Sequence, residues 1–464
     1  MAHGPLDDMV RKAMAELQAA GIPPAYVQLD DWWYPAEAAS HDHMCVRELA
    51  PNATLFPGGL PALGANTTYL LYAPFWCKDN VYAANFSFVC SPAACDPAPD
   101  DAFAFYDMLF ALQPDGAAWT NYEVDFLWDQ IQWLFLGSVD GADKWLAGMD
   151  AAARQHGKHI QYCMAHPGAF MAALAFPAVT NGRASADYIL PELNLGQLGK
   201  NMLFFSALGT VVPSKDNFWS TDNQPAVRPP PPGMRACDGG AHNNTLAELE
   251  ALLATLSTGP VGVGDAPGYT NATLVRRATA NDGRILKPAK PLTPLDASLF
   301  PSYHGPAIWQ THSVIDNVTW HWVLAPQTTA APVTISAADL WPPVAMPGRF
   351  AVRQWGATNA TIVNVSDPGT VLMTVPANQS FAYVMASPSL GDTDWVLLGE
   401  PDKFVPISAQ RLAGLTFNAS TVCVTVGPQP AADTVTLELL RLTTGDIRPL
   451  TIQSRPLLAT TGCF

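Results

Sequence analysis

The chain has 464 residues, of which 49% are hydrophobic and 14% are charged, and its formal net charge is −16. A chain of this length exceeds one ordinary domain, so we expect two domains, or one barrel with a smaller module. The acidic balance argues against a nucleic-acid partner, which needs clustered Lys and Arg, and no apolar run reaches the roughly 18–20 residues of a membrane span. A neutral, polyhydroxylated partner suits this composition better than an anionic one.

Helix-like and strand-like segments alternate through the first 300 or so residues. Apolar residues recur at helical spacing in 7–20, 142–155, 168–176, 195–208 and 245–257. The strand-like segments are 25–29, 68–76, 119–126, 159–164, 181–188, 209–213 and 258–265. Regular alternation predicts a parallel sheet, and seven strands within about 260 residues favour a (β/α)8 barrel over an open sheet.

The pattern changes after about residue 305. Short runs rich in Val, Thr and Ile alternate with Pro, Gly and Asn turns, which predicts an antiparallel β-sandwich. We therefore expect an α/β barrel domain over 1–304 and a β-sandwich domain over 305–464. Two predicted loop insertions, near 78–118 and 213–243, follow strands and should stand over the carboxyl ends of the barrel strands, where active sites form.

Glycosylation sequons are dense along the chain and predict a secreted or luminal glycoprotein. They begin at Asn52, Asn66, Asn85, Asn243, Asn271, Asn317, Asn359, Asn364, Asn378 and Asn418. The N-terminal segment MAHGPLDDMV is not a signal peptide. Either the signal peptide is missing from this chain, or the predicted compartment is wrong.

Seven of the eight Cys lie in loop or strand sequence that suits disulfides: Cys45, Cys77, Cys90, Cys95, Cys237, Cys423 and Cys463. Cys90 and Cys95 flank a Ser-Pro-Ala-Ala turn, and Cys423 and Cys463 could join two late strands. Unpaired buried thiols are the alternative, and for Cys163, inside an apolar strand, a buried thiol is the prediction. No C-x-x-C pair or His/Cys cluster indicates a metal site, and we expect no cofactor.

Acidic residues follow several of the predicted barrel strands, at the end where active sites form: Asp30, Asp31, Asp125, Asp187 and Asp265. Tryptophans lie near them in the sequence: Trp32, Trp33, Trp76, Trp128 and Trp219. Aromatic rings offer apolar faces to sugar C–H groups, and carboxylates accept hydrogen bonds from sugar hydroxyls. A single such Asp is often only a helix N-cap or loop residue, but the repetition favours a carbohydrate site. Asp265 is expected to order a loop or line the rim.

Paired carboxylates on a sugar-binding platform predict cleavage of a glycosidic bond, one acting as nucleophile and the other as acid and then base. Asp125, set deep after an apolar strand, is the better nucleophile. Asp187 is the better acid/base. Arg183, four residues before it, could bind substrate or hold a carboxylate by a bidentate pair.

The order of these segments resembles glycoside hydrolase clan D, and most of all family 36 in its α-galactosidase and raffinose-synthase branch. The likeness runs through five short motifs over residues 5–300: Leu29-Asp-Asp-Trp-Trp33, Glu123-Val-Asp125, Cys163-Met-Ala-His166, Arg183-Ala-Ser-Ala-Asp-Tyr188 and Thr258-Gly-Pro-Val-Gly-Val-Gly-Asp-Ala-Pro-Gly268. A sixth, Asp282-Gly-Arg-Ile-Leu286, stands before the β module. The resemblance implies a retaining mechanism through a glycosyl-Asp125 intermediate.

The resemblance also implies a set of substrate-binding positions: Asp30, Asp31, Trp32, Trp33, Trp76, Glu123, Cys163, His166, Arg183 and Trp219. For His166 a structural role is an equal alternative, and Trp128 is expected to pack.

Three departures from the family stand out. Glu123 replaces the usual Lys two residues before the nucleophile, and Trp32 replaces the usual Gly after the Asp pair. The segment 25–29 resembles the family's second strand, so we expect the first strand, and the large N-terminal β domain, to be missing from an incomplete chain.

Three hypotheses follow for function. The first is a retaining glycosidase or transglycosidase acting on oligosaccharides or glycosides with α-linked galactose or a related sugar. The second is a non-catalytic carbohydrate-binding relative, which Glu123 and the missing strand favour and the retained Asp125 and Asp187 oppose. The third is a structural secreted glycoprotein without sugar affinity.

Overall fold

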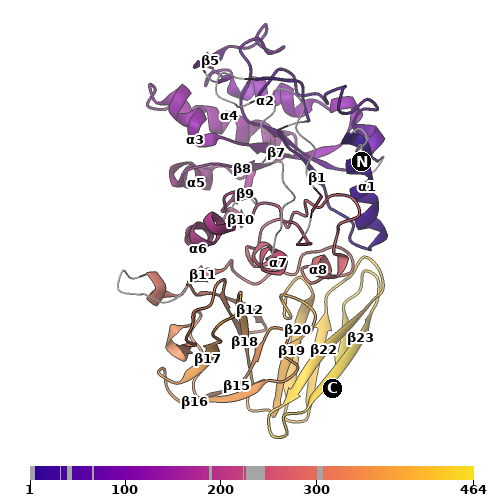
Figure 1. Cartoon of the computed structure of the whole chain (residues 1–464), viewed down its shortest axis with the longest axis vertical. Helices are drawn as coiled ribbons and strands as arrows, with labels where there is room; N and C mark the ends of the chain where they lie inside the picture. Colours follow the sequence, from indigo (N-terminus) through magenta and orange to yellow (C-terminus); the bar gives the residue numbers. More distant parts are fainter. Residues whose placement is uncertain are drawn as a thin grey trace.

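The structure is a computed structural model that describes residues 6–31, 33–38, 44–64, 67–92, 94–187, 191–222, 224–225, 246–299 and 307–464. A part built on parallel strands lies at one end of the molecule, and a set of antiparallel sheets lies at the other (Figure 1). Helices α7 (Ala247–Leu256) and α8 (Ala272–Arg276) lie where the two parts meet.

Six parallel strands form the first sheet in the order β1-β4-β7-β8-β9-β10. Their bounds are β1 (Val27–Leu29), β4 (Tyr69–Ala73), β7 (Trp119–Val124), β8 (His159–Tyr162), β9 (Val179–Arg183) and β10 (Val212–Ser214). Each strand pairs with the next one along the chain, as in a barrel, and beyond β10 a single parallel bridge joins Phe218 to Val263. The predicted fold is confirmed as a partial TIM barrel.

Helices connect and cover these strands, and most of them match the predicted segments. Their bounds are α1 (Leu6–Ala19), α3 (Leu127–Gln130), α4 (Gly141–Gln155), α5 (Pro167–Ala172) and α6 (Pro191–Leu208), in addition to α7 and α8. None of the helices in the described ranges is both long and apolar enough to cross a membrane.

One barrel helix, α2 (Ala102–Ala111), falls within the predicted 78–118 insertion, so only the part before it interrupts the barrel. Its sequence, AFAFYDMLFA, is apolar on nearly every side and therefore lacks the amphipathic period that reveals a surface helix. It packs closely on α4, where a Cβ on Gly148 would lie 2.7 Å from the Phe103 nitrogen. The predicted insertion 213–243 lies mostly outside the described residues.

Two short hairpins decorate the barrel part. The first joins β2 (Ala36–Ala38) to β3 (Met44–Val46), and the second joins β5 (Phe88–Cys90) to β6 (Cys95–Pro97). Disulfides secure both regions, because Cys45 bonds to Cys77 and Cys90 to Cys95.

Antiparallel sheets form the second part, as predicted for a β-sandwich. The largest has the order β11-β12-β13-β18-β15-β16, and the others are β14-β17, β19-β22-β23 and β20-β21-β24. Their strands are β11 (Thr293–Pro294), β12 (Trp309–Ile315), β13 (Val318–Ala325), β14 (Val333–Ser336), β15 (Gly348–Gln354), β16 (Thr361–Val365), β17 (Val371–Val375), β18 (Ala382–Pro388), β19 (Trp395–Gly399), β20 (Leu412–Asn418), β21 (Thr421–Val426), β22 (Asp433–Arg441), β23 (Ile447–Ser454) and β24 (Thr460–Cys463).

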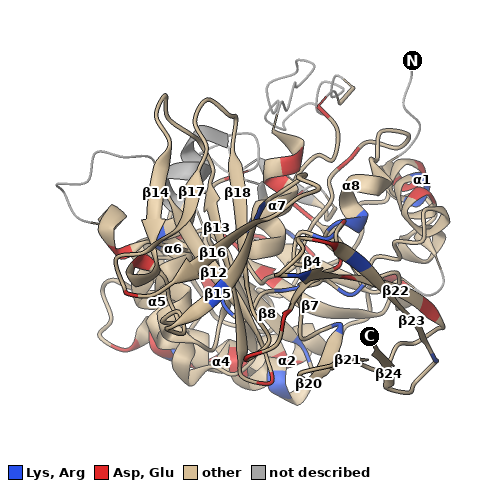
Figure 2. Cartoon of the chain, turned by 90° about the horizontal axis from the view of Figure 1, so that it is seen from below, with Lys and Arg blue, Asp and Glu red and all other residues tan. Residues whose placement is uncertain are grey.

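In these sheets, buried apolar residues alternate with more exposed ones, so that one face of a strand packs on the core. In β21 every second residue is buried, the pattern of a strand with one face on a core. Strands β13, β14, β17 and β18 carry no charged residue (Figure 2). The predicted disulfide between Cys423 and Cys463 joins β21 to β24, and Cys163 is a buried free thiol as predicted. Cys237 lies outside the described residues.

Two buried histidines make the sandwich sensitive to acid. His312 and His321 face each other across β12 and β13, and burial lowers the pKa of each to about 4. In the unfolded chain a His titrates near 6.5, so below that pH the unfolded state binds protons that the folded state refuses. The protein therefore keeps its full free energy of unfolding above pH 6.5 and loses part of it as the pH falls toward 4.

We expect the free energy of unfolding to drop by about 3 kcal/mol for His321 alone between pH 7 and pH 4. Denaturant unfolding of His321→Leu should show a flatter acid limb than the parent protein. His159→Gln, at an exposed position, is the matched control and should leave the acid limb unchanged. An acid limb as steep in His321→Leu as in the parent would contradict this assignment.

Candidate active site

Chemically active side chains gather at the carboxyl ends of the parallel strands. Asp30 follows β1, Asp125 follows β7, Cys163 follows β8, and Arg183 ends β9. Asp216 lies two residues beyond β10. Because parallel strands end on the same side of their sheet, these residues share one edge, which is where barrel enzymes build their sites.

Asp125 is nearly buried and is held in a fixed orientation. The Tyr72 hydroxyl donates to Oδ2 at 2.8 Å, and the Phe126 backbone N–H donates to Oδ1 at 2.7 Å. The Gln130 side chain donates to the Asp125 carbonyl, which fixes the backbone as well. Phe126 takes a left-handed conformation (φ 52°), so the chain turns sharply directly after the carboxylate. This arrangement suits a nucleophile that must meet one carbon atom.

Asp187 lies at the open side of the site. Arg183 reaches it with Nη2 at 2.9 Å from Oδ1, and contacts Asp216 with Nη1 at 3.4 Å from Oδ2. The Arg183 side chain is only 15% exposed, whereas that of Asp187 is 56% exposed. A buried cation therefore anchors a carboxylate that solvent can reach, which suits proton exchange.

The other acidic residues of the site lie close to one another, and their pKa values are raised. Burial, and then the charge of Asp31, raises the pKa of Asp30 to about 7. Burial, and then the charges of Asp30 and Asp125, raises the pKa of Glu123 well above its usual range. Gln28 donates to Glu123 at 2.6 Å and thereby covers one carboxyl oxygen. At neutral pH this corner of the site therefore retains protons that ordinary carboxyl groups would lose.

Electrostatic coupling ties these residues into one cluster. Burial and then the charges of both Asp125 and Asp187 raise the pKa of Asp31, so Asp31 lies within reach of both proposed catalytic carboxylates. The structure thus brings together eight residues of the site: Asp30, Asp31, Glu123, Asp125, Cys163, Arg183, Asp187 and Asp216. Among the described residues, no group of three or more His, Cys, Asp or Glu is arranged to hold a metal ion.

Two of the predicted sugar-binding tryptophans belong instead to the hydrophobic core. Trp33 is fully buried and its indole N–H donates to the Tyr72 carbonyl at 3.0 Å. Trp76 is also buried, with its ring set edge-on to Tyr82 and Phe105. Neither ring can offer a face to a sugar, so the prediction for both is corrected. Trp32 lies outside the described residues.

The remaining predicted residues lie near the carboxyl ends of the parallel strands. His166 is exposed and stacks on Trp128, with ring centroids 3.5 Å apart. Trp219, in the loop after β10, is 8% exposed. Burial raises the pKa of the Cys163 thiol, so this side chain is a neutral part of the wall. Asp265 orders a loop as predicted, because it accepts hydrogen bonds from the Ser220 N–H at 2.7 Å and from Gln224 at 2.9 Å.

Sequence reasoning missed Tyr72, Gln28 and Asp216. Asp216 carries the same signal as the residues that were found, an acid just after a strand. Tyr72 and Gln28 lie inside strands, and the hydroxyl of the buried Tyr72 requires a hydrogen-bond partner, whereas Gln28 is exposed. Only the alternation of side chains along β1 and β4 hints that these groups point toward the site.

Removing the Tyr72 hydroxyl should weaken the site without unfolding it. A hydrogen bond to a charged group contributes about 1.5–3 kcal/mol, so Tyr72→Phe is expected to lower kcat/KM by about 10- to 100-fold. Steady-state kinetics will check this. Tyr69→Phe is the matched control, because the Tyr69 hydroxyl donates to the Leu60 carbonyl away from Asp125. An equal loss in both variants would assign the effect to packing.

Comparison of the whole chain with known proteins supports the fold. No protein-family model matches the chain, and no curated protein matches its sequence. Its structure is similar to a GH27 β-L-arabinopyranosidase from Geobacillus stearothermophilus, at 13% identity and a TM-score of 0.56, over 83% of this chain and 93% of that one. It is also similar to a GH36 α-galactosidase from the same organism, solved with raffinose, at 11% identity and a TM-score of 0.51. That match covers 83% of this chain and only 53% of the other. The predicted likeness to clan D is therefore confirmed at the level of the fold.

Proposed function

We propose that the protein is a retaining glycoside hydrolase that acts on α-galactosides or related α-linked sugars, with Asp125 as nucleophile and Asp187 as acid/base. One observation carries the proposal. A rigid, nearly buried carboxylate and an exposed, Arg-anchored carboxylate follow neighbouring barrel strands, and the charges of both raise the pKa of a third acid, Asp31. Two carboxyl groups in unequal surroundings are what two-step glycosidic cleavage requires.

The reaction follows from these surroundings. An Asp125 oxygen attacks the anomeric carbon while the glycosidic C–O bond breaks, and Asp187 gives its proton to the departing oxygen. Asp187, now ionised, then takes a proton from water as that water attacks the anomeric carbon and releases Asp125. Two displacements at one carbon leave its configuration unchanged. A sugar hydroxyl that reaches the intermediate before water would give transfer instead of hydrolysis.

The other polar residues provide contacts for sugar hydroxyls. The protonated forms of Asp30 and Glu123 can donate as well as accept hydrogen bonds, whereas ionised carboxylates only accept. Arg183 would hold Asp187 in place between the two chemical steps. The aromatic contact falls to exposed or rim residues such as His166, since Trp33 and Trp76 are buried.

Secretion is part of the same proposal. Disulfides persist in oxidising compartments, and the described residues contain three of them. Among the sequons in the described ranges, all but Asn52 have an exposed Asn. Both features suit a secreted or luminal glycoprotein.

Hydrolysis of a panel of aryl α-glycosides tests the activity, with NMR of the first-formed sugar to read its anomeric configuration. We expect turnover of α-galactosides or a related α-glycoside, with the α-anomer released first. Release of the β-anomer would rule out the retaining mechanism.

A non-catalytic carbohydrate-binding protein is the second candidate. It is favoured by the barrel sheet, which has six strands in the described residues and leaves Gln28 of β1 exposed beside the site. In that case calorimetry would detect sugar binding that Asp30→Ala weakens, while no glycoside of the panel is hydrolysed.

A further inference from the structure

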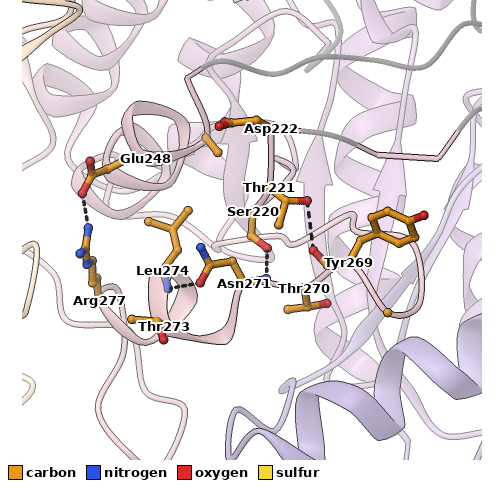
Figure 3. Close-up of a pocket in the computed structure, with 12 residues that line it drawn as sticks. Ser220, Thr221, Asp222, Glu248, Tyr269, Thr270, Asn271, Thr273, Leu274 and Arg277 are labelled. Atoms are coloured by element: carbon orange, nitrogen blue, oxygen red, sulfur yellow. Dashed lines mark hydrogen bonds and ion pairs between the residues drawn. The ribbon is translucent and has the colours of Figure 1, made fainter.

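A polar pocket lies beside α8, and none of the eight site residues named above lines it. It is open to solvent and has a volume of about 650 Å³, which is within the range of small-molecule sites. Its wall includes Ser220, Thr221 and Asp222 from the loop after β10, and Tyr269, Asn271 and Thr273 around the start of α8. Figure 3 shows Ser220, Thr221 and Asn271 close together, with Asp222 above them, Tyr269 on one side and Thr273 on the other. Hydroxyl, carboxylate and aromatic groups in one pocket are the combination that binds a saccharide.

Asn271 is also the first residue of the sequon Asn271-Ala272-Thr273. Its side-chain oxygen caps α8 by accepting from the Leu274 N–H at 3.1 Å, and its own N–H donates to the Ser220 hydroxyl at 2.7 Å. The bond from Leu274 holds the side chain in one orientation, and the bond from the backbone N–H of Asn271 to Ser220 holds the main chain; both are drawn in Figure 3. Within the described part of the chain, the side-chain amide nitrogen of Asn271 donates to no protein group. An N-linked glycan is attached to this nitrogen in place of one hydrogen.

We propose that Asn271 carries an N-linked glycan whose first sugars occupy this pocket. The cap at Leu274 uses the amide oxygen, so glycosylation of the nitrogen leaves the cap intact. The Tyr269 ring, which is 41% exposed, offers an apolar face to the sugar, and the Asp222 carboxylate can accept from its hydroxyls. The glycan thereby becomes a structural part of the region between the barrel and the sandwich.

The site differs from the other sequons in its surroundings. Asn418, for example, is the last residue of β20, directly before the turn into β21, and its side-chain oxygen accepts from the Thr421 N–H at 3.0 Å. A glycan there extends from a hairpin end into solvent. Asn418 is therefore the internal reference for a glycan at Asn271.

Glycopeptide mass spectrometry of the full chain, secreted from a glycosylating eukaryotic host, tests the proposal. We expect both Asn271 and Asn418 to be occupied. A peptide N-glycosidase acting on the folded protein should release the Asn271 glycan about fivefold more slowly than the Asn418 glycan, a protection that one aromatic contact can supply. After denaturation the two rates should be equal.

Variants at the pocket show whether slow release of the Asn271 glycan by the glycosidase is caused by contact with the pocket or by something else. Tyr269→Ala leaves the sequon intact and should abolish the protection of Asn271. Thr273→Ser keeps the sequon and should retain the glycan, whereas Thr273→Ala should lose it while preserving the cap. An unoccupied Asn271 beside an occupied Asn418, equal release rates in the folded protein, or unchanged protection in Tyr269→Ala would each overturn the proposal. None of these readings depends on turnover, so the result stands apart from the proposed hydrolase activity.

Discussion

Replacing Asp125 by Asn is expected to lower kcat/KM by at least about 10⁴-fold, the scale of losing a covalent nucleophile. The amide has nearly the same shape: its oxygen can still accept from the Phe126 N–H, and its NH2 group can donate to the Tyr72 hydroxyl, so the fold should survive. It cannot form the glycosyl ester, because an amide is a poor nucleophile. Steady-state kinetics on an activated aryl α-glycoside will measure the loss.

Two controls make this result specific. Asp96→Asn changes a buried carboxyl in β6, outside the eight site residues, whose pKa burial raises well above the usual range, so turnover should persist. In Asp125→Gly, added azide should restore turnover by attacking from the vacated side, and the product should be a glycosyl azide of inverted configuration. Activity retained in Asp125→Asn would remove Asp125 from the mechanism.

Replacing Asp187 by Asn should give a loss that depends on the leaving group. Protonation by a positioned acid contributes about 10²- to 10⁴-fold, so an alkyl α-glycoside should lose that much in kcat/KM. A dinitrophenyl glycoside, whose leaving group needs no proton, should lose far less in the step that forms the intermediate. Comparison of kcat/KM for the two substrates provides the measurement.

The pH dependence gives a second readout for Asp187. In the parent protein kcat/KM should fall at high pH partly because the general acid loses its proton, and this fall should be smaller in Asp187→Asn, where Asp30, with a pKa of about 7, still ionises. Because the Asp187 side chain is 56% exposed, its loss should leave stability unchanged. Equal losses on both substrates would mean that Asp187 only positions Arg183.

The sequence predicted the barrel because its strands and helices alternate and because polar residues end the strands. The sequence did not predict α2, because a helix that is apolar on nearly all sides lacks the helical period that distinguishes it from a buried strand. The six strands found in the described residues are shorter than the predicted segments. In the sandwich, alternation and turn residues were sufficient. Cys90 and Cys95 could be paired from the turn between them, and Cys423 and Cys463 from their late strands.

The same limit explains the errors within the site. A Trp placed just after a strand can turn toward the ligand or into the core, and sequence does not distinguish these outcomes. Trp33 points into the core, where its indole N–H donates a hydrogen bond to the Tyr72 carbonyl. Conversely, Tyr72 was overlooked because its ring looks like strand packing, although its hydroxyl contacts Asp125. Side-chain direction, which only the fold supplies, decides both.

As the proposed nucleophile, Asp125 should form a covalent bond to the sugar. Incubation with an activated 2-deoxy-2-fluoro α-glycoside, followed by digestion and tandem mass spectrometry, tests it most directly. We expect one sugar adduct, on the carboxylate of Asp125 in the peptide that contains Tyr122-Glu-Val-Asp125, and none in Asp125→Asn. An adduct on another carboxylate, such as Asp31 or Asp187, or hydrolysis of the reagent without any adduct, would contradict it.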